Sequence, residues 1–316
     1  MRVLITGGAG FIGSTLTDAL LTRGDEVVII DDFNDYYSPQ RKRANIAALR
    51  SAAGLTLYEQ DFTDAQAVDR IVGQHRPDVI AHIGAMGSVR YSVQKPHLYY
   101  NVNLVGTLNV LEAARHHGVT RVVFASTSSV YGQTDKVPFV ETDPTDRPLA
   151  PYPATKKAAE VLGHAYHNMH GVQFTALRFF NVYGPKGRPD MMPYIVLERI
   201  LRDQEITLFD NGRMHRDWTY IDDIIADLDA AFDRPMPYEI INLGRGEPVL
   251  MSDFMTLAQE IVGRQARIHV VPAPPSEPKI TYANIDKARR LLEYNPRTSV
   301  KEGLTNFWRW YQQAVG

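Results

Sequence analysis

The chain has 316 residues, with 34 Lys and Arg against 36 Asp and Glu, so its formal net charge is −2. Nucleic-acid-binding proteins normally carry a large excess of positive charge, so this composition argues against a nucleic-acid partner. Hydrophobic residues make up 44% of the chain and cysteine is absent, which indicates a globular protein without disulfides, thiolate nucleophiles or cysteine-ligated metals.

No window of the sequence approaches the roughly 18 apolar residues that a helix needs to cross a bilayer. The opening residues, MRVLITGGAGFIG, form a short apolar run that ends in glycines, unlike the longer stretch of a signal peptide. We therefore expect a cytoplasmic protein with no membrane partner. His116 and His117 stand at a predicted helix end beside Gly118, where capping explains them, and no metal site is expected.

Apolar runs rich in β-branched residues alternate with amphipathic stretches through residues 1–180. Buried strands are predicted at Val3–Ile5, Glu26–Ile30, Leu55–Tyr58, Val79–Ile83, Arg121–Ser126 and Gln173–Arg178. Helices are predicted between them at Phe11–Arg23, Gln40–Ala52, Ala65–Gln74, Leu98–His116 and Ala154–His170. This alternation is typical of an α/β fold with a Rossmann-like, doubly wound parallel sheet.

After Pro185 proline and glycine become denser, and the predicted helices become shorter. The later predicted elements are a strand and helix at Trp218–Asp233, a strand at Tyr238–Leu243, a helix near Ser252–Val262, a loop at Pro272–Pro278 and helical structure from Asn284 onward. Ser252 and Asp286 are predicted N-caps. We expect a nucleotide-binding domain at 1–183 with return elements at about 218–245, and a smaller interleaved lobe at 184–316.

The segment Thr6–Gly13 reads TGGAGFIG and joins the first predicted strand to the first predicted helix. Glycines at this spacing permit a tight turn and a close approach of the backbone to a pyrophosphate, which the helix N-terminus then binds. Asp31 and Asp32 follow the second strand, about 20 residues on, where a carboxylate can accept a hydrogen bond from an adenosine ribose. Because a carboxylate repels a 2′-phosphate, the pattern favours NAD over NADP.

Three further segments are predicted to border this nucleotide. Asp61 and Phe62 follow the third strand, where a side chain could meet adenine; the less favoured alternative for Asp61 is a solvated turn residue. His82–Met86, with Ile83, Gly84 and Ala85, ends the fourth strand at the edge of the sheet where ligands bind. Asn103 lies inside a predicted helix, where we expect a functional or a bridging role.

Tyr152 and Lys156 are four residues apart, which places a phenol and an ammonium on one face of a helix. A phenol is a poor base at neutral pH, and a neighbouring cation favours the phenolate. Such a pair occurs by chance in many helices. Here it comes after the segment ASTSSVYG at the end of another strand, where Thr127 can hydrogen-bond a substrate hydroxyl beside Tyr152.

In this order the motifs are highly specific, and the chain resembles the extended short-chain dehydrogenase/reductase family, in its nucleotide-sugar epimerase branch. The resemblance rests on TGGAGFIG, Asp31, Asp61, HIGAMGSVRYS, Asn103, ASTSSVYG, the Tyr152 and Lys156 pair, RFFNVYGPKGRPDM and HRDWTYIDD. It implies a catalytic set of Thr127, Tyr152 and Lys156, and a nucleotide diphosphate held by Asn181 and Arg216. It implies NAD-binding residues that include Gly7, Gly10, Phe11, Ile12, Asp31, Asp32, Asp61, Phe62 and Lys156.

Relatives in this branch first oxidise the sugar at C4 and differ in the fate of the 4-keto sugar. Dehydratases usually carry Asp-Glu directly after the catalytic Thr, and decarboxylases carry Glu two residues after it. This chain has Ser128 and Ser129 there, and neither hydroxyl can replace a carboxylate acid or base. The resemblance therefore implies epimerisation at C4, with NAD recycled.

The segments Asp31–Tyr37, Ser88–Ser92 and Gly187–Met191 resemble those of UDP-glucuronate 4-epimerases. The uronate carboxylate is expected to meet Arg188, with Thr127, Ser128 and Ser129 as neutral donors; Arg90 is a further candidate. Arg188 could instead form a structural ion pair, and Arg90 could be solvated on a helix face.

Asn181 is the residue of UDP-glucose/galactose 4-epimerases, so a UDP-hexose epimerase is the second interpretation of the sequence. A decarboxylase and a non-catalytic NAD-binding module come after it. The family resemblance further implies a homodimer formed through the helices at Leu98–His116 and Ala154–His170.

Overall fold

The structure, a computed structural model, describes residues 1–274 and 278–315 and divides into two compact units. The first unit consists of Met1–Gly132, Pro144–Phe179 and Ile225–Ile241. The second consists of Gln133–Asp143, Phe180–Ile224 and the described part of Asn242–Gly316. The segment Gln133–Asp143, which no sequence pattern separated from its surroundings, thus belongs with the later part of the chain.

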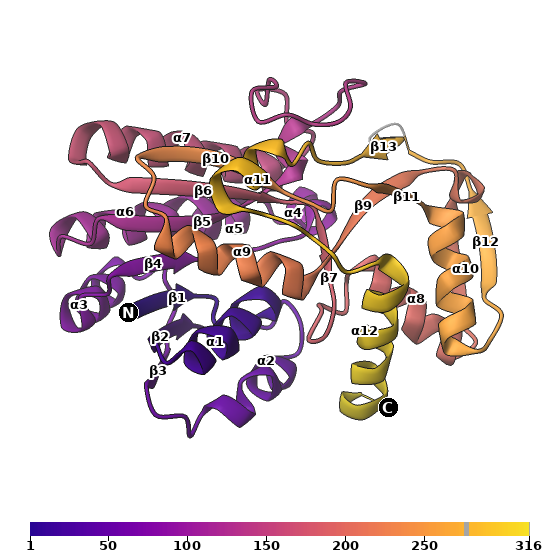
Figure 1. Ribbon diagram of the computed structural model, residues 1–316, viewed down its shortest axis with the longest axis horizontal. Coiled ribbons are helices and arrows are strands. Elements are labelled where there is room, and N and C mark those ends of the chain that lie inside the picture. The colour runs from indigo at the N-terminus through magenta and orange to yellow at the C-terminus, as the bar shows by residue number, and fades with distance from the viewer. Residues whose placement is uncertain (275–277, 316) are drawn as a thin grey trace. The chain divides into compact units, whose positions relative to one another are not determined.

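A seven-stranded sheet forms the centre of the first unit. Its strands are β1 (Arg2–Thr6), β2 (Glu26–Asp31), β3 (Leu55–Glu59), β4 (Val79–His82), β5 (Arg121–Thr127), β6 (Gln173–Phe179) and β10 (Tyr238–Leu243). They follow the order β10-β6-β5-β4-β1-β2-β3 (Figure 1), and the pairings that join β1 through β6 are parallel. Most strand residues are buried, because helices cover both faces. The α/β, doubly wound fold predicted from the sequence is confirmed.

The helices of the first unit form two layers. Helices α3 (Ala65–His75), α6 (Gly106–His116) and α7 (Pro151–His170) contact one another in sequence on one face. Helices α1 (Phe11–Arg23), α2 (Pro39–Asn45) and the later part of α9 (Ile221–Asp233) lie on the other side of the sheet (Figure 1). Short helices α4 (Val89–Gln94) and α5 (Pro96–Tyr99) lead through a π-helical turn, Tyr100–Val105, into α6.

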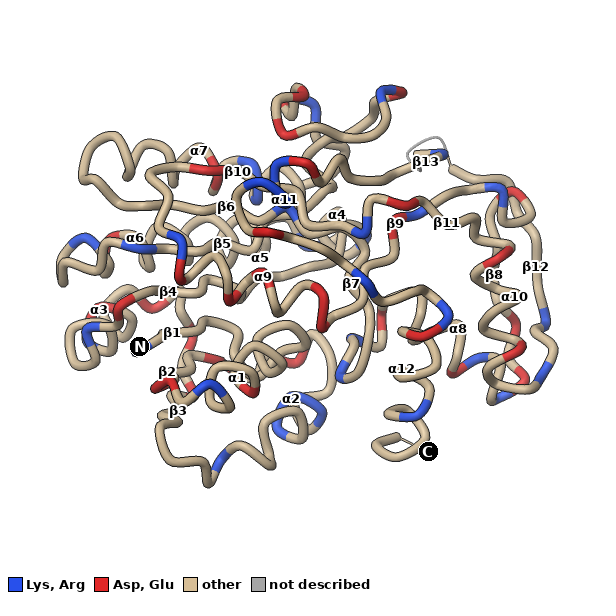
Figure 2. The backbone as a smooth tube through the Cα atoms, viewed as in Figure 1, with Lys and Arg blue, Asp and Glu red and all other residues tan. Residues whose placement is uncertain are grey.

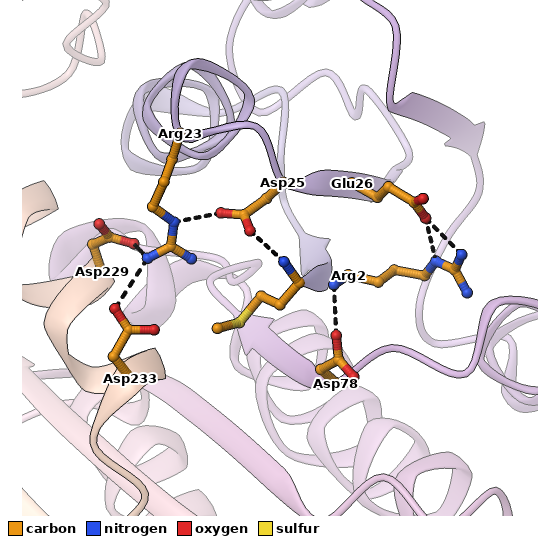
Figure 3. A network of polar contacts seen from close by, with 8 residues as sticks. Arg2, Arg23, Asp25, Glu26, Asp78, Asp229 and Asp233 are labelled. Atoms are coloured by element: carbon orange, nitrogen blue, oxygen red, sulfur yellow. Dashed lines mark hydrogen bonds and ion pairs between the residues drawn. The ribbon is translucent and has the colours of Figure 1, made fainter.

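An ion-pair network joins α9 to the first strands (Figure 3). The guanidinium of Arg23 lies 2.5 Å from Asp25, 2.5 Å from Asp229 and 3.2 Å from Asp233. Arg2 pairs with Glu26 at the adjoining strand ends. The guanidinium of Arg23 thus links the end of α1 to α9, which comes about 200 residues later in the chain. Such charged hydrogen bonds fix the orientation of α9 more specifically than a hydrophobic contact would. Figure 2 shows basic and acidic residues interspersed along the backbone.

The second unit contains small sheets and four helices among its described residues. Strand β9 (His215–Tyr220) pairs with β7 (Asn181–Tyr183), β11 (Pro248–Leu250) and β13 (Ile280–Thr281), and β8 (Glu205–Phe209) pairs with β12 (Arg267–Val271). The core includes Trp218 packed against Phe254, with ring centroids 4.9 Å apart and the ring planes tilted by 32°. The helices wholly inside it are α8 (Met192–Leu201), α10 (Met251–Val262), α11 (Asp286–Leu292) and α12 (Val300–Ala314).

Several local predictions were wrong. The helix predicted at Gln40–Ala52 ends at Asn45 and is followed by a short 3-10 turn, Ala47–Leu49. Neither Ser252 nor Asp286 is an N-cap, because each lies inside its helix. The N-cap of α10 is Leu250 and that of α11 is Ile285, and both are apolar.

The helical structure predicted from Asn284 onward is broken between α11 and α12. Glu293 has a positive φ and Pro296 follows it, and neither continues a helix. The predicted loop at Pro272–Pro278 lies partly outside the described residues. Among the residues that the structure does describe, no helix is both long and apolar enough to span a bilayer.

Candidate active site

The turn after β1 brings two backbone segments into close contact. Gly7 has a φ of +70°, and a Cβ built on it would lie 2.6 Å from the Cα of Gly84. Gly10 precedes α1 and offers no side-chain cap to the helix, whose first residues are Phe11 and Ile12. The turn is therefore a backbone cradle at an uncapped helix N-terminus, the arrangement that binds pyrophosphate.

Asp31 ends β2 and fastens this turn from the side. One carboxylate oxygen accepts the N–H of Ala9 and the other accepts the N–H of Phe33, both at 2.9 Å. Burial raises the pKa of Asp31, and the two backbone bonds oppose that rise. Each oxygen can accept a second bond, so the carboxylate retains acceptor capacity for ribose hydroxyls. Asp32 is exposed and accepts one backbone and one side-chain N–H of Asn34.

Lys42, which no sequence pattern singled out, is buried beside these acids. Its ammonium donates to the carbonyl of Asn34 at 2.8 Å and to the side-chain oxygen of Asn34 at 2.9 Å. Burial lowers the pKa of Lys42, while Asp31, Asp32 and Asp35 act in the opposite sense. The sequence offered no signal beyond a lysine inside the predicted helix at Gln40–Ala52.

The segments predicted to border the nucleotide lie at the ends of β3 and β4. Asp61 is exposed and accepts the N–H of Thr63 at 2.8 Å. The ring of Phe62 is turned inward against His82, with centroids 5.4 Å apart, beneath Gly84 and Gly106. Ile83 and Ala85 flank Gly84, whose N–H donates to the carbonyl of Thr6 at 2.8 Å.

Asn103 lies in the π-helical turn and is buried. Its side-chain oxygen accepts the N–H of Met86, and its amide group donates to the carbonyl of Met86 and to the hydroxyl of Thr155. Both amide protons are therefore engaged within the protein, which is the bridging role left open by the sequence. A π-turn at such a position is common at functional sites.

Thr127, Tyr152 and Lys156 all belong to the first unit, at the end of β5 and in the first two turns of α7. The Lys156 side chain is buried, and its ammonium lies 4.4 Å from the centroid of the Phe124 ring. Burial lowers the pKa of Lys156 to about 7, and Glu160 opposes this shift. The Tyr152 ring packs edge-on against Tyr99, with centroids 6.1 Å apart.

A buried ion pair between Arg178 and Glu160, which no sequence pattern indicated, lies next to Thr127, Tyr152 and Lys156 in the fold. Glu160, one turn after Lys156, accepts two bonds from Arg178 at 2.9 and 2.8 Å and one from Ser126 at 2.6 Å. Arg178 also lies over the ring of Tyr131, 4.8 Å from its centroid. The pair thus holds α7 to the strand end and turn that carry Thr127. The sequence offered only one indication of this pair: Glu160 lies within a predicted helix and Arg178 within a predicted buried strand.

The other residues predicted for the substrate in this unit are Ser128, Ser129 and Arg90. Ser128 and Ser129 are half-buried in the 3-10 turn that follows β5, and the N–H of Ser129 donates to the Thr127 hydroxyl at 3.2 Å. Arg90 is exposed on α4. The two serines therefore continue directly from the end of the strand that bears Thr127.

The second unit carries Asn181, Arg188 and Arg216. Asn181 is the first residue of β7 and pairs with Trp218 of β9. Arg216 lies on the same strand as Trp218, two residues before it. One nitrogen of Arg216 donates to the carbonyls of His215 and Pro278, both at 2.8 Å. Arg188 makes two bonds to the carboxylate of Asp190, at 2.9 and 3.1 Å, so the ion pair considered from the sequence is present.

Asp217, next to Arg216, is a further buried acid that the sequence did not single out. Its carboxylate accepts the N–H groups of Arg245, Gly246 and Ala283 and the hydroxyl of Thr219, at 2.7 to 3.2 Å. It therefore joins three segments around the strand that carries Arg216. Across residues 1–274 and 278–315 no group of three or more His, Asp or Glu could hold a metal ion.

Comparison with known proteins agrees with this arrangement. The UDP-glucuronate 4-epimerase of Thermodesulfobacterium geofontis is 37% identical over 99% of this chain and 96% of its own length. The structure of UDP-glucuronic acid 4-epimerase from Bacillus cereus, with UDP-glucuronic acid and NAD, matches with a TM-score of 0.92 at 34% identity and 99% coverage of both chains.

UDP-glucose 4-epimerase from Thermotoga maritima, with UDP-glucose, matches with a TM-score of 0.89 at 30% identity and 100% coverage of both chains. The model of the family described as GDP-mannose 4,6 dehydratase matches residues 4–307. The chain therefore belongs to this family of extended short-chain dehydrogenases/reductases, and its fold agrees with these matches.

Proposed function

We propose that this protein is an NAD-dependent UDP-sugar 4-epimerase that interconverts UDP-glucuronate and UDP-galacturonate. One observation carries the proposal: the carboxyl ends of parallel strands bear the glycine turn, Asp31 and Thr127, and the helix after Thr127 bears the buried Lys156 one turn from Tyr152. Ligands of doubly wound sheets bind at this edge. The similarity to UDP-glucuronate 4-epimerases over nearly the full chain supports the same assignment.

The residues of the first unit fit NAD. A side chain at Gly7 would fill the space against Gly84, so the turn is built for backbone approach to a diphosphate. The adenosine ribose is assigned to Asp31 and Asp32, whose negative charge disfavours a 2′-phosphate. The remaining contacts are assigned to the cofactor residues predicted from the sequence: Gly10, Phe11, Ile12, Asp61, Phe62, Ile83, Gly84, Ala85, Tyr152 and Lys156. Asn103, also predicted for the cofactor, would support it indirectly, because its amide protons bond Met86 and Thr155.

The catalytic steps fall to Thr127, Tyr152 and Lys156. When bound, NAD supplies the acceptor and the donor of hydride at C4. Tyr152 takes the proton of the 4-hydroxyl as C4 is oxidised and returns it to the 4-oxygen as C4 is reduced. The Lys156 ammonium favours the phenolate form of Tyr152. The Thr127 hydroxyl orients the 4-oxygen toward Tyr152. Rotation of the 4-keto sugar between the two transfers inverts C4.

Ser128 and Ser129 make epimerisation the outcome. Elimination or decarboxylation in this family uses carboxylates at these positions, whereas a serine hydroxyl neither ionises nor protonates a leaving group at neutral pH. We assign the two serines to neutral hydrogen bonds with the sugar. The 4-keto intermediate then meets no carboxylate acid or base at these two positions.

The assignment of a uronate rests on Arg188 and the hydroxyls of Thr127–Ser129. A 4-keto uronate is a β-keto acid that loses carbon dioxide when its carboxylate stands perpendicular to the ketone, so the enzyme has to hold the carboxylate away from that geometry. In this structure Asp190 binds the guanidinium fork of Arg188, so the substrate carboxylate would share or displace that contact. Asn181 and Arg216 are assigned to the diphosphate, and Arg90 to a peripheral contact.

Incubation of the purified protein with UDP-glucuronate, with and without added NAD, tests the proposal by proton NMR of the products. We expect UDP-galacturonate with no net consumption of NAD. Tyr152→Phe should lower kcat by about 10²- to 10⁴-fold, because proton transfer by a positioned group contributes that much. Arg188→Ala should raise the share of pentose product. A pentose as the main product of the unmodified enzyme would contradict the assignment of Ser129.

A second candidate is UDP-glucose/galactose 4-epimerase, favoured by one residue, Asn181, and by the similarity to the Thermotoga maritima enzyme. Turnover of UDP-galactose with none of UDP-glucuronate would establish it.

A homodimer in the cytoplasm completes the proposal. Exposed apolar side chains gather on α4–α7, and include Val93 at 65% exposed, Val161 at 57% and Met169 at 68%. Solvated apolar side chains on neighbouring helices are typical of an interface between copies. Sedimentation of the protein and cell fractionation test the two parts separately.

A further inference from the structure

A chain of buried hydrogen bonds runs through the first unit from the glycine turn to the catalytic helix. It begins at Thr6, the last residue of β1, whose hydroxyl accepts the N–H of Gly84 at 3.1 Å. The same hydroxyl lies 2.6 Å from Nδ1 of His82. On the other side of the ring, Nε2 of His82 lies 2.9 Å from the hydroxyl of Thr107.

The donors and acceptors of this chain can be assigned one by one. The hydroxyl of Thr107 donates its single proton to the carbonyl of Asn103 at 2.6 Å, so it can only accept from His82. Nε2 of His82 must therefore carry the proton, and Nδ1 must be the acceptor for Thr6. His82 is 1% exposed, and burial followed by the charge of Lys156 lowers its pKa to about 3, which keeps the ring neutral.

The same chain continues from Asn103 into α7. The amide of Asn103 donates to the hydroxyl of Thr155 at 3.1 Å, and that hydroxyl donates to the carbonyl of Tyr152 at 2.7 Å. Thr6, Thr107 and Thr155 are each at most 1% exposed, so water does not compete for these bonds. The chain thus begins beside Gly7 and ends on the backbone of Tyr152 itself.

We propose that His82, locked in its neutral Nε2–H tautomer between Thr6 and Thr107, is a positioning residue that couples the glycine turn to the helical turn bearing Tyr152. The inference rests on the proposed function, because Tyr152 is the residue whose placement matters for the reaction. An imidazole suits this place, since it bridges a donor on one side and an acceptor on the other without a charge. Reversal of any one hydroxyl in the chain would leave two donors or two acceptors facing each other.

The test compares Thr107→Val, which removes the acceptor for Nε2–H at nearly constant volume, with Thr107→Ser, which restores it. Thr175→Val is the matched control, because Thr175 is equally a buried threonine but lies on β6 outside this chain. Nitrogen-15 spectra of labelled histidine report the tautomer of His82 in each variant. Carbon-13 spectra of labelled tyrosine, assigned with Tyr152→Phe, report the environment of the Tyr152 ring before any substrate is added.

We expect the Nε2–H tautomer in the unmodified protein and in Thr107→Ser, and a mixed population in Thr107→Val. Thr107→Val should shift the Tyr152 signal and lower kcat at least 10-fold with KM within 2-fold, whereas Thr107→Ser and Thr175→Val should leave both near their original values. An Nδ1–H or protonated ring in the unmodified protein would overturn the proposal. So would a Tyr152 signal that moves no more in Thr107→Val than in Thr175→Val.

The spectra and the kinetic measurements test this proposal and the proposed function separately. If the unmodified enzyme turns over no UDP-sugar, the proposed function fails, while the tautomer and the Tyr152 signal still decide whether the coupling exists. If turnover is found but kcat is the same in Thr107→Val and Thr175→Val, the coupling has no part in catalysis and the positioning role is rejected.

Discussion

Lys156 is a side chain whose burial is costly for the fold and to which we assign a role in the site. Its ammonium is buried on a helix, with an aromatic face and Glu160 as its neighbours. An ammonium in such a place loses most of its hydration, which is why the pKa of Lys156 falls to about 7 from its ordinary value of 10.5. A buried lysine with a lowered pKa is more typical of a functional site than of a residue that stabilises the fold.

Lys156→Met should therefore abolish turnover and raise the thermal stability of the ligand-free protein. The unfolded chain binds a proton at this residue up to its ordinary pKa, whereas the folded protein releases it above about pH 7. The gain should be about 1–4 kcal/mol at pH 6 and should shrink as the pH rises toward 10. Urea unfolding at several pH values measures it. Lys157→Met, on the same helix but partly exposed, is the control and should not stabilise.

His82 gives a pH dependence of the same sign as Lys156, because its pKa is also lowered by folding, but at the acid end of the scale. Its pKa of about 3 in the folded protein lies below the ordinary value of 6.5, so the unfolded chain takes up a proton that the folded protein refuses. Stability from this residue is complete above pH 6.5 and is lost as the pH falls toward 3. Between pH 7 and pH 5 the loss should be about 2 kcal/mol. Unfolding of His82→Gln should lack this part of the pH dependence, and an unchanged slope would contradict the assignment.

At the level of elements, the contact of α7 with β5 and β6 depends on a buried ion pair. Arg178 and Glu160 have side chains 1% and 0% exposed, and no solvent replaces a missing partner. Removing one charge from such a pair is far more harmful than removing both, because the remaining ion stays desolvated.

Glu160→Gln should lower the free energy of unfolding by about 3–5 kcal/mol, and Glu160→Leu combined with Arg178→Met by much less. Denaturant unfolding measures both. The exposed pair of Arg43 and Glu59 supplies the control, since Glu59→Gln should leave the unfolding midpoint unchanged within error. Equal losses in the single and double variants would show that packing, and not the charge, holds the helix.

The sequence predicted elements best where local pattern and burial coincide. The helix at Phe11–Arg23 and the strand at Tyr238–Leu243 agree with their predicted bounds, because an uninterrupted apolar pattern ends at a glycine or a polar turn. It failed at Ser252 and Asp286, where a capping residue type stands near a helix start that packing places one or two residues earlier. The glycine turn TGGAGFIG could be recognised from the sequence, because the spacing of its glycines is enough to identify it.

The supporting residues could not be predicted in the same way. Lys42, Glu160 and Arg178 are recognisable only by their long-range partners, and the same letters in a helix or strand normally indicate a solvated face. His82 stood in a motif that the sequence singled out, yet its role depends on Thr6 and Thr107, which lie 76 and 25 residues away. Roles for the residues of the second unit, Asn181, Arg188 and Arg216, stay predictions.

At the scale of the whole molecule, the exposed apolar side chains on α6 and α7 predict self-association. Val161→Asp should convert the dimer to a monomer, because a buried carboxylate without a partner is costly at an interface. Light scattering after size exclusion measures the mass. Ile268→Asp, which changes a 41% exposed side chain on β12, is the control and should remain dimeric. A monomeric unmodified protein would contradict the proposal.

The network around Arg23 also bears on the order in which the chain can fold during synthesis. Strands β1 to β6 leave the ribosome first, but β10 and the part of α9 that carries Asp229 and Asp233 emerge only after Phe180–Ile224. Until then the outer edge of β6 has no neighbouring strand, and Arg23 lacks two of its three acidic partners. A nascent chain that ends near residue 200 therefore exposes a sheet edge open to wrong pairing. The first domain to begin translation is thus completed only after much of the second has been made.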